Sequence, residues 1–316
     1  MNQPIRLRLG ARGLQKVEWH KAEWNALGSQ VSIQLYTTRA QAQQLITESF
    51  NWLAKFEGLA SRFNADSQVS ELNQANGQRT EVDSMLLDTL AASIWAAQKT
   101  SGIVDPLVHQ QMQAIGYQTS RNELDAEVAW STVWDQPQHL AQAEPSHTWR
   151  QIKLGDRWAQ LPGNHQYDPG AVGKGLAADR IAELLSCQVP AVLVDMGGDI
   201  RVQVESDLPG FNVQLQDPRS DELWTQIQLQ SGAVATSSVC KRLWLKDGQP
   251  CHHLLSPADG KSVWSGLAGV AAFAPSALEA ETLAKQAVLL GSADDLEYGG
   301  ILYPSDPAIA PRVVGS

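Results

Sequence analysis

A long amphipathic stretch near the N-terminus most constrains the fold of this chain. From Arg39 to Phe63, apolar side chains recur at the spacing of one helical face, which predicts a helix with one buried side. Val31 to Tyr36, just before it, alternates apolar and polar residues as a half-buried β-strand does. This pairing predicts a helix that packs on a sheet.

Both patterns return later in the chain, without the strict strand–helix alternation of a parallel α/β fold. Helical spacing recurs at 82–100, 176–185 and 278–290. Short runs typical of strands lie at 191–195, 211–216, 224–230, 243–246 and 269–273. Strands in runs together with long helices favour an α+β fold with mixed sheets and packed helices.

We expect one domain over residues 23–316, behind an N-terminal extension over residues 1–22. The 43% hydrophobic content is enough for a large core. The segment 120–150 is rich in Trp, Gln, Glu and His and only weakly periodic, so we expect a surface insertion there. Its Trp side chains are more typical of packing than of ligand contacts.

Charge and hydropathy exclude two classes of partner. The formal net charge is −10 and no long Lys/Arg run occurs, so the chain lacks the basic footprint of a nucleic-acid binder. No window offers the ~20 apolar residues of a membrane helix. The N-terminal stretch has arginines but no apolar segment of a secretory signal, which predicts a cytoplasmic protein as written, or a periplasmic one if the chain is a trimmed form.

A glycine-rich loop before a predicted helix is the first candidate site. The sequence Asp168-Pro-Gly-Ala-Val-Gly173-Lys174-Gly175 lets backbone N–H groups approach a ligand closely. A helix N-terminus favours phosphate, and Lys174 adds a positive charge. The loop lacks the spacing of a nucleotide-binding P-loop, so a simple glycine turn with a surface lysine is an equally good interpretation.

Two further segments carry polar groups at turns. Gly197-Gly198-Asp199 follows a strand, where bare backbone can lie against a ligand. His252 and His253 are adjacent, so on an extended segment they point to opposite faces and cannot both grip one metal. One neutral imidazole could act as a general base, although a hairpin pair with one buried and one solvated ring is also consistent.

The last candidate is a charge pair on the late predicted helix. Glu281 and Lys285 are four residues apart, so they share a helix face and can form an ion pair. An exposed pair of this kind contributes only about 0.3–0.5 kcal/mol and is common on helix surfaces. The pair alone therefore indicates no function.

Taken in order, these motifs resemble the ApbE family, the FAD:protein FMN transferases, from about Trp24 to Leu290. The matching segments are Leu27-Gly28-Ser29, Ser61-Arg62-Phe63 with Ser67 to Asn73, Gly102 to Pro106, Asp168 to Asp179, Gly197-Gly198-Asp199, Thr236-Ser237, His253 to Gly260 and Ala280 to Lys285. Eight collinear motifs are far more specific than any one of them.

The resemblance implies an α+β fold with FAD in a cleft between two halves of the chain. Relatives transfer FMN from FAD to a Ser or Thr hydroxyl of an acceptor flavoprotein and release AMP, usually with Mg²⁺, and a histidine matching His253 is the candidate base. Flavin and adenine contacts would come from Leu27, Phe63 and Asp105, and pyrophosphate contacts from Lys174. The cofactor-binding positions implied are Leu27, Phe63, Asp105, Asp168, Gly173, Lys174, Gly198 and Thr236.

The departures from the family pattern cluster at its metal site, which maps to Gly173, Glu281 and Lys285. The family usually has Asp and Thr where this chain has Glu281 and Lys285, and Ala where it has Gly173. Mg²⁺ requires oxygen ligands, so the ammonium of Lys285 opposes it. Either Mg²⁺ is held by Glu281, Asp residues and carbonyls with Lys285 turned aside, or Lys285 takes the place of Mg²⁺.

Three functions follow from this pattern. The first is an FMN transferase acting on a partner protein, and the second is an FAD-binding protein with impaired transfer. The third, an ordinary flavin or nicotinamide oxidoreductase, is weaker because no Gly-x-Gly-x-x-Gly follows a strand.

Overall fold

The computed structural model describes residues 16–118, 128–135 and 141–315. Its centre is an eight-stranded sheet in the order β1-β2-β6-β7-β10-β13-β14-β15, with every neighbouring pair antiparallel. The strands are β1 (Val17–Ala26), β2 (Ser29–Thr38), β6 (Ala191–Met196), β7 (Asp199–Val204), β10 (Ser231–Ser238), β13 (Leu267–Ala274), β14 (Gly300–Pro304) and β15 (Arg312–Val314).

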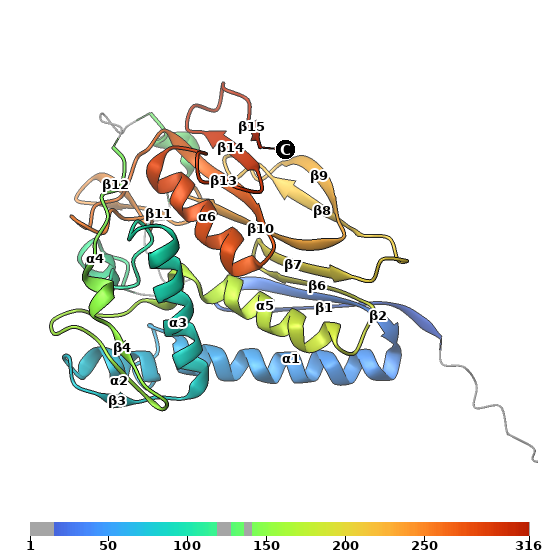
Figure 1. Ribbon diagram of the computed structural model, residues 1–316. Coiled ribbons are helices and arrows are strands. Elements are labelled where there is room, and N and C mark those ends of the chain that lie inside the picture. The colour runs from blue at the N-terminus through green and yellow to red at the C-terminus, as the bar shows by residue number, and fades with distance from the viewer. Residues whose placement is uncertain (1–15, 119–127, 136–140, 316) are drawn as a thin grey trace, which may run out of the picture.

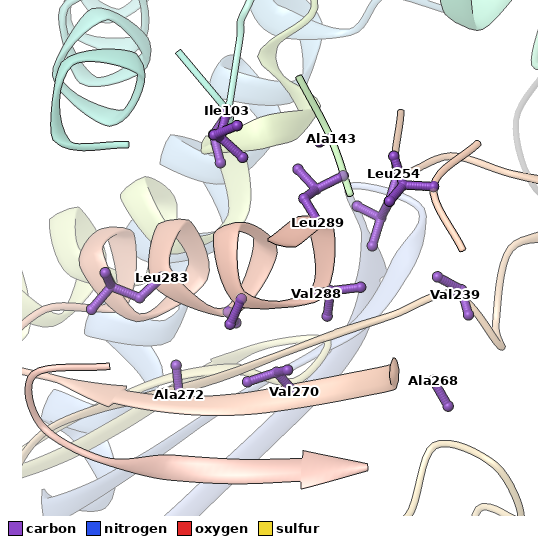
Figure 2. Packing of buried hydrophobic residues seen from close by; sticks show 14 of the residues in the cluster. Ile103, Ala143, Val239, Leu254, Ala268, Val270, Ala272, Leu283, Val288 and Leu289 are labelled. Carbon is purple, nitrogen blue, oxygen red and sulfur yellow. The ribbon is translucent and has the colours of Figure 1, made fainter. Parts of the chain in front are cut away.

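Three helices cover one face of this sheet. Figure 1 shows α1 (Arg39–Ala60), α5 (Gly173–Ser186) and α6 (Ala277–Leu290) side by side along it. Each buries an apolar stripe, and α1 and α5 share a core with β2 and β6. Figure 2 shows α6 above the strand that carries Val270 and Ala272, with Ile103 and Leu254 on its other side. The sheet and helices therefore form two packed layers.

A small hairpin covers the opposite face. β8 (Phe211–Gln216) pairs with β9 (Leu223–Leu229). The apolar side chains of β8 alternate into the core, and Val213 and Leu215 pack against Ile200 and Tyr303 of the central sheet. The sheet is thus buried on both sides along its middle.

The remaining elements gather at one end of the two layers (Figure 1). The helices there are α2 (Gln68–Gln74), α3 (Ser84–Lys99) and α4 (His109–Ala114), with short 3₁₀ turns η2 (Trp130–Thr132), η3 (Thr148–Gln151) and η4 (Pro169–Ala171). The strands are β3 (Thr80–Glu81), β4 (Lys153–Leu154), β5 (Trp158–Gln160), β11 (Leu243–Lys246) and β12 (Gln249–His252). This end has its own core around α3 and Tyr167.

Two expected boundaries differ from the structure. β1 pairs with β2 from Val17 onward, so residues 17–22 belong to the central sheet rather than to an extension; residues 1–15 lie outside the described residues. As an edge strand, β1 is half exposed along its length. Polar residues on both of its faces hide the apolar–polar alternation that predicts a strand from the sequence.

The segment expected to be a surface insertion, 120–150, contributes to the core where the structure describes it. Trp130, Val133, Ala143 and Trp149 are all buried, because large apolar side chains gain most by leaving water. The stretches 120–127 and 136–140 lie outside the described residues. Within the described ranges, no helix has the length and apolar character needed to cross a membrane.

Candidate functional site

A large cavity, of about 610 Å³, lies where the β1–β2 turn meets α1 and the start of α5. Leu27 and Gly28 form this turn with positive φ angles of 53° and 65°. The Leu27 N–H donates to Glu57 Oε1 at 2.9 Å, which ties the turn to α1. The backbone of the turn is therefore held in place at the rim of the cavity.

An aromatic wall with an embedded guanidinium closes one side of the cavity. The Arg62 guanidinium carbon lies 4.3 Å from the ring centres of both Phe63 and Tyr117. Tyr117 in turn stacks on Trp244, with ring centres 5.3 Å apart. Phe63 is 43% exposed and lines the cavity, so an apolar ring is presented to whatever enters.

The glycine-rich loop forms the opposite side. Asp168 Oδ1 accepts from Gly170 N at 2.8 Å and its Oδ2 lies 3.4 Å from Arg62 Nε, which links the loop to the aromatic wall. α5 begins at Gly173 without a side-chain cap. Gly173 and Lys174, at this uncapped start of the helix, line the cavity, whereas the Gly175 N–H donates to Glu281 Oε2.

Lys174 pairs with a buried carboxylate behind the cavity. Its Nζ donates to Asp199 Oδ2, and Asp199 is 1% exposed. Burial lowers the pKa of Lys174, but the carboxylates of Asp199 and Glu281 outweigh it and raise the pKa above its usual value. Lys174 is thus positively charged at the cavity edge.

A second, small cavity of about 60 Å³ adjoins the first, and Gly170 lines both. Asp105, Asp168, His253 and Lys285 line it. Asp105 Oδ1 accepts from Leu107 N, while its buried Oδ2 has no hydrogen-bond partner within the described ranges, and burial raises the Asp105 pKa. A ligand donor could bond this oxygen.

The two adjacent histidines have different surroundings. His252 is fully buried and meets Trp264 edge-on, with ring centres 4.6 Å apart. His253 lines the small cavity, and its Nδ1 is buried without a hydrogen-bond partner in the part of the chain that the structure describes. Burial and the charge of Arg242 hold the pKa of His253 well below its usual value, so the ring is neutral at neutral pH.

Glu281 is fully buried at the contact between α5 and α6. Its Oε2 accepts from Gly175 N at 2.8 Å, and its Oε1 accepts from Lys285 Nζ at 2.6 Å. Burial raises the pKa of Glu281, and the nearby ammonium of Lys285 lowers it. Both carboxylate oxygens thus already have a donor.

These residues do not fit a divalent cation as they are arranged. Mg²⁺ needs several oxygen ligands in octahedral geometry, but the Glu281 oxygens are engaged and an ammonium stands beside them. No group of three or more His, Cys, Asp or Glu side chains that could hold a metal occurs among residues 16–118, 128–135 and 141–315.

The sequence-based candidates separate into three groups. Leu27, Phe63, Gly173 and Lys174 line the large cavity. Asp105, Asp168, His253 and Lys285 line the small one. Gly198, Thr236 and Glu281 line neither; the Thr236 N–H donates to Gly198 O at 3.3 Å beside Asp199, and Glu281 reaches the small cavity only through Lys285.

Tyr117 and Arg242 also line the large cavity and were not predicted from the sequence. Tyr117 follows the short helix α4, and Arg242 follows Lys241 directly before strand β11. Arg242 has no ion-pair or hydrogen-bond partner among the described residues, yet its charge acts on both Lys174 and His253. Its place ten residues before the histidine pair was the available signal.

Asp179, which belongs to one of the motifs that resemble the ApbE family, has a structural role. Its two carboxylate oxygens accept from the N–H groups of Ala277 and Leu278 at 2.8 and 2.9 Å. This carboxylate satisfies the free donors at the start of α6 and favours its helix dipole. Asp179 therefore positions α6, the helix that carries Glu281 and Lys285.

Comparison with known proteins gives a consistent result. Residues 27–299 match the ApbE family. The chain is 26% identical over 303 residues to the FAD:protein FMN transferase of Treponema pallidum, covering 87% of this chain and 79% of that one. It is 24% identical over 263 residues to a protein of the same name from Klebsiella pneumoniae, covering 81% and 77%.

Solved structures share the fold. The ApbE protein of Thermotoga maritima superposes with a TM-score of 0.78 at 21% identity, covering 94% of this chain and 97% of that one. The flavin transferase ApbE of Vibrio cholerae gives 0.73 at 17% identity, covering 95% and 98%. With the family match over most of its length and this shared α+β fold, the chain belongs to the ApbE family.

Proposed function

We propose that this protein transfers FMN from FAD to a Ser or Thr hydroxyl of an acceptor flavoprotein and releases AMP. The observation that carries the proposal is the junction of the two cavities at Gly170. A space of about 610 Å³, lined by Lys174 and Arg242, shares Gly170 with the smaller cavity, which is lined by the neutral imidazole of His253. The relatives named above as FAD:protein FMN transferases support this assignment.

FAD would lie along the large cavity. Phe63 and Tyr117 offer aromatic surface to a flat ring, and the turn at Leu27 offers backbone groups at the rim. Asp105 has one carboxylate oxygen without a partner among the described residues and would accept a hydrogen bond from a ring N–H or a hydroxyl. The start of α5, with Gly173 and Lys174, would face the pyrophosphate. Gly198 and Thr236, which are hydrogen-bonded to each other beside Asp199, would support the side of the cavity that Lys174 lines.

In the transfer step, the acceptor hydroxyl oxygen forms a bond to the phosphorus of the FMN half. The bond between that phosphorus and the bridging oxygen of the pyrophosphate breaks, and AMP leaves with the bridging oxygen. His253, neutral at the small cavity, takes the hydroxyl proton and can pass it to solvent or to the AMP phosphate.

The charge that develops on the phosphates is met by this chain's own cations. Lys174 stands at the cavity edge, and Arg242 faces the same cavity without an ion-pair partner among the described residues. Oriented cations and helix N–H groups lower the barrier of phosphoryl transfer mainly by placing charge where it is needed.

A second function is favoured by one observation. The Glu281–Lys285 pair saturates the position where relatives bind a metal, which would suit an FAD-binding protein with slow or absent transfer. The two functions share the FAD site and differ only in the transfer step.

The deciding experiment follows flavin onto an acceptor. The purified chain is incubated with FAD and an acceptor domain that carries a flavinylation-type Ser/Thr site, and flavin fluorescence is read on the acceptor band of a denaturing gel. We expect a fluorescent band that is lost with His253→Ala and kept with His20→Ala, a control on strand β1. FAD binding without any acceptor fluorescence would replace transfer by the second function.

A further inference from the structure

We infer that the ammonium of Lys285 is a built-in cation that takes the place of a divalent metal, so that this chain holds FAD without Mg²⁺. The inference rests on the proposed FAD site. It concerns the three groups at the α5–α6 contact: the Glu281 carboxylate, the Lys285 ammonium and the N–H of Gly175. In this set each carboxylate oxygen has a donor, and the two opposite charges are paired.

The contact is too tight for a further ligand. A Cβ on Gly175 would lie 2.6 Å from Ala277 O and 2.8 Å from Glu281 Oε2, so the backbone of α5 sits directly against α6. This closeness brings the Gly175 N–H to 2.8 Å from Glu281 Oε2. On this side the Glu281 carboxylate is enclosed by α5. The two helices are as close as the hydrogen bond from the Gly175 N–H allows, which leaves no room for a metal ion between them.

The ammonium closes the other side. The Lys285 side chain is 12% exposed and that of Glu281 1%, and the 2.6 Å contact between them is a charge-assisted hydrogen bond. Because Lys285 also lines the small cavity, its positive charge is presented toward His253 and Asp105. A divalent cation would have to displace this ammonium and leave it without a counter-ion in a buried place.

The remaining carboxylates near the site are also committed. Asp199 pairs with Lys174, and Asp168 is engaged by the Gly170 N–H and Arg62. Asp105 keeps one oxygen without a partner among the described residues, but a single oxygen is not a ligand set for Mg²⁺. The ammonium of Lys285, held by its side chain on α6 and paired with Glu281, is therefore the cation that lines the small cavity.

The test compares FAD affinity with and without divalent cations. FAD binding to the full chain is titrated by flavin fluorescence in excess EDTA and in millimolar Mg²⁺. We expect dissociation constants within twofold of each other. The double variant Glu281→Asp with Lys285→Thr, which restores oxygen ligands, should bind FAD at least tenfold more weakly in EDTA and recover with Mg²⁺.

A matched control uses a lysine that also pairs with α6 but lies outside both cavities. Lys99 contacts Glu279 and Glu297, and Lys99→Met should leave FAD affinity and its independence of Mg²⁺ unchanged. A wild-type affinity that falls tenfold in EDTA and returns with Mg²⁺ would overturn the inference, whether or not the double variant folds.

A direct metal measurement separates this inference from the proposed function. Mn²⁺ binding to the chain is followed by electron paramagnetic resonance, with and without FAD. Absence of stoichiometric binding supports the built-in cation even if no transfer to an acceptor is ever seen, and one tightly bound Mn²⁺ per chain contradicts it. If FAD does not bind under any condition, the proposed function fails. Mn²⁺ binding alone then shows whether Lys285 takes the place of a divalent metal.

Discussion

The two cavities that meet at Gly170 use their charges in opposite ways. In the large cavity Arg242 has no ion-pair partner among the described residues, and the Phe63 side chain is 43% exposed. At the small cavity Lys285 is already neutralised by Glu281, which in turn bonds Gly175. The Arg242 charge thus remains available to a ligand, whereas the Lys285 charge is already paired when the chain folds. Substitution of Arg242 should change binding alone, and substitutions at the Glu281–Lys285 pair should also change stability.

The largest expected effect is at the buried Glu281–Lys285 pair. Lys285→Met leaves Glu281 charged and buried without its counter-ion, which should lower the free energy of unfolding by about 3–5 kcal/mol. Adding Glu281→Gln removes the charge and keeps an acceptor for Gly175 N, so the double variant should regain most of the loss. Urea unfolding measures both. Equal losses in the two variants would mean that the pair is not a closed unit.

The next effect tests the tight helix contact. Gly175→Ala places a Cβ 2.6 Å from the Ala277 carbonyl oxygen, and such overpacking should cost about 1–3 kcal/mol of unfolding free energy. Gly173→Ala is the matched control, because its Cβ would find nothing closer than Phe56 at 3.9 Å. We expect Gly173→Ala to be neutral or slightly stabilising. Urea midpoints compare the two, and a harmless Gly175→Ala would show that α5 and α6 can separate.

A binding effect without a stability effect is expected in the large cavity. Arg242→Gln should weaken FAD binding about tenfold, the equivalent of ~1.4 kcal/mol, because it removes a charge that no described residue uses. Its urea midpoint should not move. Lys241→Gln is the control, because it removes one positive charge at the adjacent residue, whose exposed side chain pairs with Asp221. A stability loss at Arg242 with unchanged FAD affinity would reverse the distinction between the cavities.

The smallest effect concerns the histidine pair and pH. Burial lowers the pKa of His252 to about 3 and that of His253 well below its usual value. The unfolded chain takes up protons near pH 6.5 while the folded chain keeps both rings neutral, so their stabilisation is complete above pH 6.5 and is lost as the pH falls. Each ring should contribute about 1 kcal/mol per unit between pH 6 and 5. His252→Phe should reduce that slope in urea unfolding at a series of pH values, and an unchanged slope would contradict the neutral buried ring.

Much of the fold could be predicted from local patterns. Residues 39–63 were expected to be helical and form α1 from Arg39 to Ala60, and the strands at 211–216 and 243–246 have the expected bounds. Five strands of the central sheet, β1, β7, β10, β14 and β15, were not predicted. β7 directly follows the Gly197-Gly198 turn, β10 has Gly232 as its second residue, and β1 is an edge strand with polar residues on both faces.

The candidate site was predicted less evenly. Collinear motifs identified Leu27, Lys174 and His253, which line one cavity or the other. Arg242 was missed because a single arginine carries no local signal: its importance depends on which groups surround it after folding. The separation of candidates between two cavities was likewise invisible, since it depends on the meeting of loops far apart in the chain.

The sequence by itself determined the helices, several strands and the order of motifs that identifies the ApbE family, because these depend on residue spacing along the chain. It also determined that Glu281 and Lys285 share a helix face. Only the tertiary structure decided what that pair does. The close approach of α5 at Gly175 buries the carboxylate and directs the ammonium to it, and such an approach depends on packing between segments about 100 residues apart.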